Sequence, residues 1–206
     1  DRDARPVRGH DSREADDTGR RREHGRPRLA SDVDSAVLPG RTRLRGIAER
    51  TRDRARPRVA CIEWIEPLMA AGNWTPELLA LAGADDVLGV AGRHAGAIEF
   101  EQLAAADPDA IWITPCGFDL ARTRAELAPL TGHPGWPALK AVREGCVFLG
   151  DGNALFNRPG PRVVETLECL AEALHPGAFR FGHEGTGWQR LEPVAAGGVQ
   201  ARASRH

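Results

Sequence analysis

Aromatic and amide side chains recur just beyond the apolar segments of this chain. A ring face covers flat apolar surface, while a side-chain amide both donates and accepts hydrogen bonds. Where such groups converge, they suit a large, flat ligand that carries amides of its own. The set that we identify is Trp64, Asn73, Trp74, Phe118, Asn153, Phe156, Asn157 and Arg158.

Cys116 is the residue most open to reactive chemistry. It follows an apolar segment and precedes a Gly-Phe turn, a place where a nucleophile can sit. No histidine lies near it in the sequence, so we interpret it as a packed or cleft-lining thiol. A small α/β enzyme that uses Cys116 is the alternative.

The patterns that hold metals and phosphates are missing. The seven histidines show neither H-x-H nor H-E-x-x-H spacing, and the four cysteines form no C-x-x-C pair. The GDGN stretch at 150–153 fits neither the G-x-G-x-x-G nor the P-loop pattern. We therefore expect no metal site and no cofactor, and we take His94 as a single contact that faces a cleft.

Apolar segments alternate with helical patterns, and this alternation defines the elements that must position these groups. Strands are predicted at 58–64, 110–114 and 147–150, with helices between them and an amphipathic helix after the Asn-rich loop that begins at 151. The order predicts an α/β fold with a parallel sheet flanked by helices. Because ligands bind beyond the carboxyl ends of such strands, the polar turns are expected to meet at one edge.

Charge and aromatic content divide the chain. Residues 1–58 hold 17 Arg against 11 acidic residues, and all five Trp and six Phe follow them. We expect a disordered Arg/Asp-rich tail at 1–40, because it has too little apolar surface to fold. Acids interleave with its arginines and no aromatic ring is available for base stacking, so no nucleic-acid partner is expected. A charged helix is predicted at 41–56, the folded lobe at 57–178 and an irregular tail at 179–206.

No apolar run reaches the length of a signal peptide or a membrane span, and the first residue is not Met. We therefore expect a fragment or a processed product.

Three runs resemble one family. They are PRVACIEWIEPLMAAGNWTPELLALAG, IEFEQLAAADPDAIWITPCGFDLARTRAEL and VFLGDGNALFNRPGPRVVETLECLAEALHP, which together cover roughly residues 57–176. In order and spacing they resemble the cobalamin-type substrate-binding proteins of ABC importers, the corrinoid and iron-siderophore class.

The resemblance implies one Rossmann-like lobe of a two-lobed protein whose lobes are joined by a long helix. Residues 41–56 resemble the end of that helix, so we expect this chain to hold the C-terminal lobe and to lack the first. It also implies binding of cobalamin or a related corrinoid as transported ligand, without catalysis. The alternatives are a haem or ferric-siderophore ligand, or a remnant that binds nothing.

The resemblance also implies roles for individual residues at matching positions. The resemblance adds Cys116 and Gly117 to the ligand-facing residues, and it makes Glu165 and Glu168 the candidates for docking to the arginines of the importer membrane subunits. It implies a periplasmic or cell-envelope location. The cytoplasm is the alternative, since the chain shows no signal segment.

Overall fold

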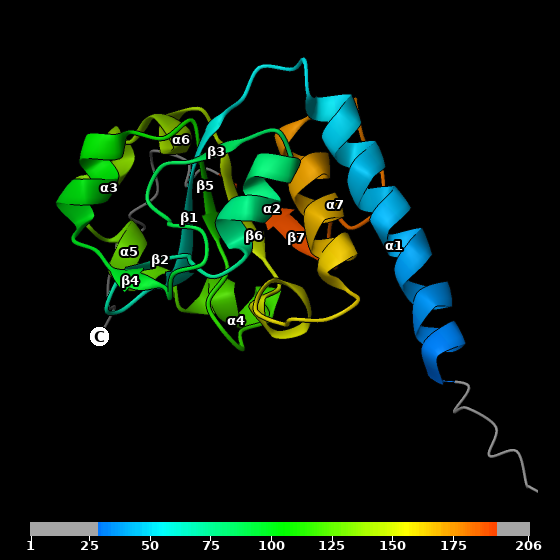
Figure 1. Ribbon diagram of the computed structural model, residues 1–206. Helices are drawn as coiled ribbons and strands as arrows, with labels where there is room; N and C mark the ends of the chain where they lie inside the picture. Colours follow the sequence, from blue (N-terminus) through cyan, green and yellow to red (C-terminus); the bar gives the residue numbers. More distant parts are fainter. Residues whose placement is uncertain (1–28, 193–206) are drawn as a thin grey trace, which may run out of the picture.

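The predicted apolar segments form the central strands of one sheet (Figure 1). The computed structural model describes residues 29–192, with side chains from residue 40 onward. The strands are β1 (Arg58–Trp64), β2 (Met69–Ala70), β3 (Asp85–Asp86), β4 (Gly96–Ala97), β5 (Ala110–Ile113), β6 (Val147–Gly150) and β7 (Trp188–Arg190). The helices are α1 (Leu29–Thr51), α2 (Thr75–Leu81), α3 (Phe100–Ala106), α4 (Leu120–Ala125), α5 (Ala128–Thr131), α6 (Lys140–Arg143) and α7 (Val163–Leu174), with short turns η1 (Trp136–Ala138) and η2 (Gly152–Phe156).

The centre of the sheet is parallel and its margins are antiparallel. Strands β3, β1, β5 and β6 run parallel, with Ile113 of β5 opposite Ile62 on one side and Leu149 on the other. Strands β2, β4 and β7 run antiparallel to their neighbours. The expected α/β fold is confirmed, but the sheet is mixed. The link at 65–68 is too short for the crossover that a parallel neighbour of β1 would need.

Side chains alternate along the strands and fill two separate cores. Val59 and Cys61 of β1 face the layer of α2 and α7, whereas Ala60 and Ile62 face the layer that contains α3 and α6. Burial on both faces explains why the central strands read as continuous apolar runs. None of the helices between residues 29 and 192 combines the length and the apolar content that a bilayer crossing requires.

Helix α1 begins at Leu29, well before the start expected at residue 41, and ends at Thr51. Pro39 and Gly40 are poor helix formers, so the sequence favoured a start after them. Extending a helix whose later turns are already fixed costs much less than nucleating one, which explains how α1 continues through them. The remainder of the expected disordered tail, residues 1–28, lies outside the described residues.

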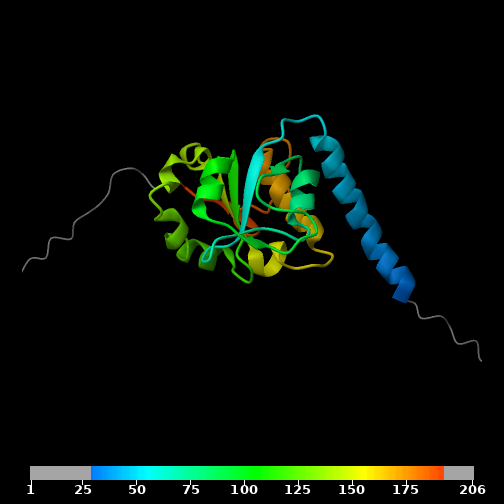
Figure 2. The same ribbon diagram turned by 60° about the vertical axis from the view of Figure 1, so that its left-hand side comes forward.

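The later turns of α1 are fixed against α7. A Cβ atom on Gly40 would lie 3.3 Å from Cγ2 of Val164. Nε and Nη2 of Arg43 donate to the two carboxylate oxygens of Glu168 at 2.9 and 2.7 Å, and Ile47 is buried in the core. Before Gly40 the helix extends past the start of α7 and away from the lobe (Figures 1 and 2).

The C-terminal segment is ordered as far as the structure describes it. The prediction of an irregular tail from residue 179 is wrong for β7, which pairs with β6. Phe179 and Trp188 are buried against the body of the lobe. Phe181 is 37% exposed. The strand was missed because three residues within a Gly-rich stretch carry no readable alternation. Residues 193–206 lie outside the described part of the chain.

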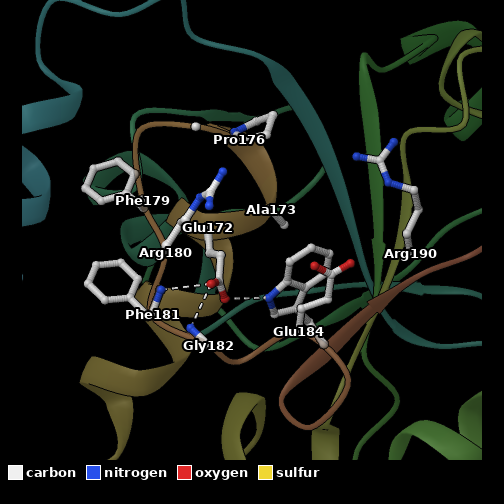
Figure 3. A pocket seen from close by; sticks show the side chains of 11 residues that line it. Glu172, Ala173, Pro176, Phe179, Arg180, Phe181, Gly182, Glu184 and Arg190 are labelled. Carbon is white, nitrogen blue, oxygen red and sulfur yellow. Dashed lines mark hydrogen bonds between the residues drawn. The ribbon is translucent and has the colours of Figure 1, made fainter.

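Glu172 of α7 holds this segment in place (Figure 3). One carboxylate oxygen accepts the backbone N–H groups of Phe181 and Gly182, both at 2.8 Å. The other accepts the backbone N–H of His183 and the indole N–H of Trp188, both at 3.0 Å. Partial burial by itself would raise the pKa of Glu172, but the hydrogen bonds from Trp188 and the three backbone groups outweigh it and lower the pKa.

Replacing Glu172 with glutamine is expected to lower the free energy of unfolding by about 1–3 kcal/mol at pH 7, because hydrogen bonds to a charged acceptor are lost. Since the folded-state pKa is lowered, this contribution is full above the ordinary pKa of a glutamate and is lost as pH falls through the folded value. Urea unfolding of both proteins from pH 7 to pH 3 measures the difference. Glu184→Gln, at an exposed position, is the control. A constant difference across this range would contradict the assignment.

Candidate functional site: the rim of the sheet

Separate turns meet at the carboxyl ends of the parallel strands. Glu63, near the end of β1, accepts the backbone N–H of Gly72 with Oε2 at 3.3 Å and that of Cys116 with its carbonyl oxygen at 3.2 Å. The backbone N–H of Asn153 donates to the carbonyl oxygen of Phe118 at 3.0 Å. These bonds connect four stretches from different parts of the sequence. We call them the rim: residues 64–66, 72–74, 115–118 and 151–158.

An aromatic pair forms one side of the rim. The rings of Trp64 and Phe118 lie 5.3 Å apart at 60°, and the guanidinium carbon of Arg122 lies 3.7 Å from the centre of the Phe118 ring. Phe118 is therefore 6% exposed, whereas Trp64 is half-buried and open to a ligand. A hollow of about 290 Å³ lies beside the pair. Its walls are Trp64, Ile65, Glu66, Pro115, Phe118, Glu126 and Pro129.

The 151–158 turn is held by its own side chains. Oδ1 of Asp151 accepts the backbone N–H of Asn153 at 2.9 Å, and Nδ2 of Asn157 donates to the carbonyl oxygen of Thr114 at 2.9 Å. Nε of Arg158 donates to the carbonyl oxygen of Asn153 at 2.7 Å, so its charge is not neutralised by a carboxylate there. Asn153 and Arg158 are exposed, and they offer amide and guanidinium donors to a ligand.

Two glycines allow the turns to touch. A Cβ atom on Gly152 would lie 2.1 Å from the carbonyl oxygen of Pro115, so only glycine permits this approach. Gly117 has φ of +78°, which a side chain would strain. Gly117 is exposed and contributes backbone to the rim.

The 72–74 turn forms the part of the rim that lies on the other face of the sheet. Asn73 has φ of 54°, and its carbonyl oxygen accepts the backbone N–H of Gly92 at 2.8 Å. Trp74 is half-buried and packs on the core beneath α2 and α7. His94 is exposed in the adjoining loop, where its Nδ1 lies 3.0 Å from the carbonyl oxygen of Ala95. The two tryptophans thus lie at the same edge but in different layers.

Phe156 does not belong to the exposed surface of the rim. It is 1% exposed, and its ring lies 5.1 Å from that of Trp112 in the core. The prediction that Phe156 contacts a ligand is therefore corrected, because η2 turns this ring inward. The other predicted ligand contacts stay predictions, and all of them lie at the rim or in the loop beside it.

The two glutamates expected to dock to a transporter are engaged within the lobe. Glu168 is 3% exposed and lies between Arg43 and Nε2 of His183, which is 2.9 Å away. It is not available for a partner in this structure, so that prediction is corrected. Glu165 is half-buried and forms an ion pair of 2.8 Å with Arg162.

The rim offers little for catalysis or metal binding. Cys116 is exposed, and its backbone N–H donates to the carbonyl oxygen of Glu63, with no base hydrogen-bonded to its sulfur among the described residues. Burial raises the pKa of the Cys61 and Cys169 thiols, which disfavours the reactive thiolate. Within residues 29–192, no group of three His, Cys, Asp or Glu side chains is placed to hold a metal ion.

Two larger hollows lie away from the rim. One of about 800 Å³ opens at the amino ends of the strands, beside Arg54 and His175. The other, of about 620 Å³, lies between β7 and the loop at 176–184, where the Glu172 carboxylate is already saturated (Figure 3). Neither is lined by an asparagine or glutamine side chain, whereas Asn153 is exposed at the rim, so we place the candidate site there.

The sequence interpretation missed three charged residues, one in the rim and two beside it. Glu66 and Glu126 line the hollow, and Arg122 covers Phe118. One signal was readable for Arg122. Asp119 caps α4 by accepting the backbone N–H of Arg122 at 2.7 Å, and a residue four positions after Phe118 on that first turn points back over the ring.

Comparison with known proteins gives a family and a fold. The family model described as periplasmic binding protein matches residues 31–154. A periplasmic haem-binding protein from Pseudomonas aeruginosa shares 27% identity over 72% of this chain and 55% of its own, with a TM-score of 0.60. No curated protein gives a significant match.

Two further structures show the same fold at lower identity. An ABC-type Fe³⁺-hydroxamate transport system protein from Saccharomonospora viridis is 22% identical, over 70% of this chain and 50% of its own, with a TM-score of 0.58. The periplasmic vitamin B12 binding protein of Vibrio cholerae is 22% identical, over 65% and 50%, with a TM-score of 0.51. The chain therefore spans about half the length of the solved structures that it matches.

Proposed function

The chain belongs to the periplasmic binding protein family, and we propose that it supplies a ligand-binding lobe of the substrate-binding component of an ABC importer. The observation that carries the proposal is the rim, where turns from four parts of the sequence present half-buried tryptophan rings and an exposed amide at one edge. Family and neighbours are binding proteins, which agrees with the prediction of a binding protein in place of an enzyme. Because α1 extends beyond the lobe, a second lobe joined through it would face the rim.

The ligand that we favour is a corrinoid such as cobalamin. The Trp64 ring supplies a partly exposed apolar face, and Asn153 supplies a side-chain amide for the peripheral amides of the macrocycle. The B12-binding protein of Vibrio cholerae supports this choice at the level of the fold. Haem is the second candidate, and the identity of 27% with the haem-binding protein of Pseudomonas aeruginosa favours it.

Partner and location follow from the same proposal. The membrane subunits of an ABC importer are the expected partner, and the periplasm or cell envelope is the expected compartment. The exposed side of the rim is the surface that such a partner and a closing lobe would approach. Since Glu168 is buried, we do not assign it to docking.

Trp64→Ala and Trp74→Ala are each expected to weaken cyanocobalamin binding about 10- to 100-fold, because an aromatic face contributes strongly to covering a flat ligand. Absorbance titration of the wild-type chain and both variants measures the change, with the folded fraction of each determined by circular dichroism. Phe181→Ala, an exposed aromatic position away from the rim, is the control and should bind as the wild type does. Equal affinities in all four proteins would refute the proposed site.

A further inference from the structure

The hollow beside Trp64 and Phe118 carries an unbalanced charge. Among the described residues that line it, two are carboxylates, Glu66 and Glu126, and none is basic. Glu66 is exposed, and its carboxylate forms no ion pair or hydrogen bond within the described chain; the indole N–H of Trp64 donates to the backbone oxygen of Glu66 at 2.8 Å. A free acceptor therefore stands at the edge of the aromatic surface.

Arg122 lies beside the hollow but does not make it positively charged. Nε of Arg122 donates to Oε1 of Glu126 at 3.0 Å while its guanidinium lies over Phe118, so Arg122 is already paired. Arg158 belongs to the 151–158 turn and does not line the hollow. The rim is thus acidic on the Trp64 side and basic at Arg158.

A primary amide and a carboxylate differ sharply in such a place. The amide brings two N–H donors, which a carboxylate of the protein can accept, whereas a ligand carboxylate brings acceptors and a like charge. A like charge roughly 7 Å away at an effective dielectric constant between about 20 and 80 weakens binding about 3- to 50-fold. The Glu66 side of the rim should therefore bind an amide-bearing edge of the ring more tightly than a carboxylate-bearing edge.

We propose that this hollow selects its ligand by charge, admitting a neutral, amide-bearing edge of the macrocycle and rejecting a carboxylate-bearing edge, with Glu66 and Glu126 as specificity-determining residues. The inference rests on the proposed function and narrows its ligand class. It favours amide-fringed corrinoids over tetrapyrroles whose edge carries free carboxylates. It also orients a mixed ligand, with any anionic group directed away from Trp64.

The test uses cyanocobalamin and its monocarboxylic acids, in which one peripheral amide is replaced by a carboxylate. Each isomer is titrated separately against the wild-type chain, Glu66→Gln, Glu126→Gln and Glu144→Gln. Glu144 is an exposed carboxylate in the hollow at the opposite end of the strands, so its variant matches the change in net charge. The readout is the ratio of the acid and amide dissociation constants within each protein.

We expect at least one isomer to bind the wild type about 3- to 50-fold more weakly than cyanocobalamin. This ratio should fall in Glu66→Gln, fall also in Glu126→Gln because Arg122 is then unpaired, and stay unchanged in Glu144→Gln. High salt should reduce the wild-type ratio, since it screens the repulsion. A wild-type ratio near one for every isomer, or equal ratios in the Glu66 and Glu144 variants, overturns the inference and leaves the proposed function standing. Absence of saturable cyanocobalamin binding to the folded wild type overturns the proposed function, and this inference with it.

Discussion

Arg43→Ala is expected to lower the free energy of unfolding by about 3 kcal/mol, and with it the melting temperature by roughly 6–12 °C. The variant removes two charge-assisted hydrogen bonds from Glu168, which is 3% exposed, whereas the side chain of Arg43 is 51% exposed. His183 remains as a partner, which keeps the loss at the lower end of the range for broken buried pairs. Thermal and urea unfolding followed by circular dichroism measure the change.

Two further variants separate this ion pair from a general effect of charge. Arg45→Ala removes an exposed arginine from the same helix and should change stability by less than about 0.5 kcal/mol. Arg43→Met combined with Glu168→Leu replaces the pair by apolar groups, and most of the stability should return. If Arg43→Ala proves as stable as Arg45→Ala, the pair does not hold α1 to α7.

Phe156→Ala is expected to cost about 3–5 kcal/mol of folding free energy, the usual loss for a large ring removed from a packed core. The side chain is 1% exposed and packs against Trp112, beneath the turn that carries Asn153 and Arg158. Chemical denaturation measures the loss. Cyanocobalamin affinity, corrected for the folded fraction, should change much less than in Trp64→Ala.

The comparison with Trp64→Ala decides whether Phe156 belongs to the core or contacts the ligand. Trp64 is half-buried at the rim, so its removal should weaken binding while the lobe stays folded. If Phe156→Ala keeps the melting temperature of the wild type and loses the ligand, the ring contacts the ligand and the correction made above is wrong.

The sequence predicted the strands that position the rim because their burial on both faces leaves a clear trace. Residues 110–113 and 147–150 are apolar without a break, and 59–62 form an apolar run within 58–64; these segments become β5, β6 and β1. Parallel strands place their following turns at a common edge, so the meeting of the 115–118 and 151–158 turns was also predictable. The periodicity of apolar residues does not indicate where a side chain points within an irregular turn.

Phe118 and Phe156 illustrate that limit. Both follow a strand by a few residues, yet Phe118 lies at the rim beside Trp64 and Phe156 enters the core. The partners of Glu168 were equally invisible, because Arg43 is 125 residues away in the sequence. An acidic residue on the core side of an amphipathic helix indicates a buried partner, but local patterns do not identify it.

From Gly40 onward helix α1 packs against α7, and its last turn also contacts α2 and the segment after α7, while its earlier turns extend past the lobe. The ion pair between Arg43 and Glu168 connects this helix to α7. A force on the protruding turns of α1 would therefore act on α7, which begins at Val163, shortly after the turn that carries Arg158. Tilting α1 would therefore shift the cationic margin of the rim relative to Trp64.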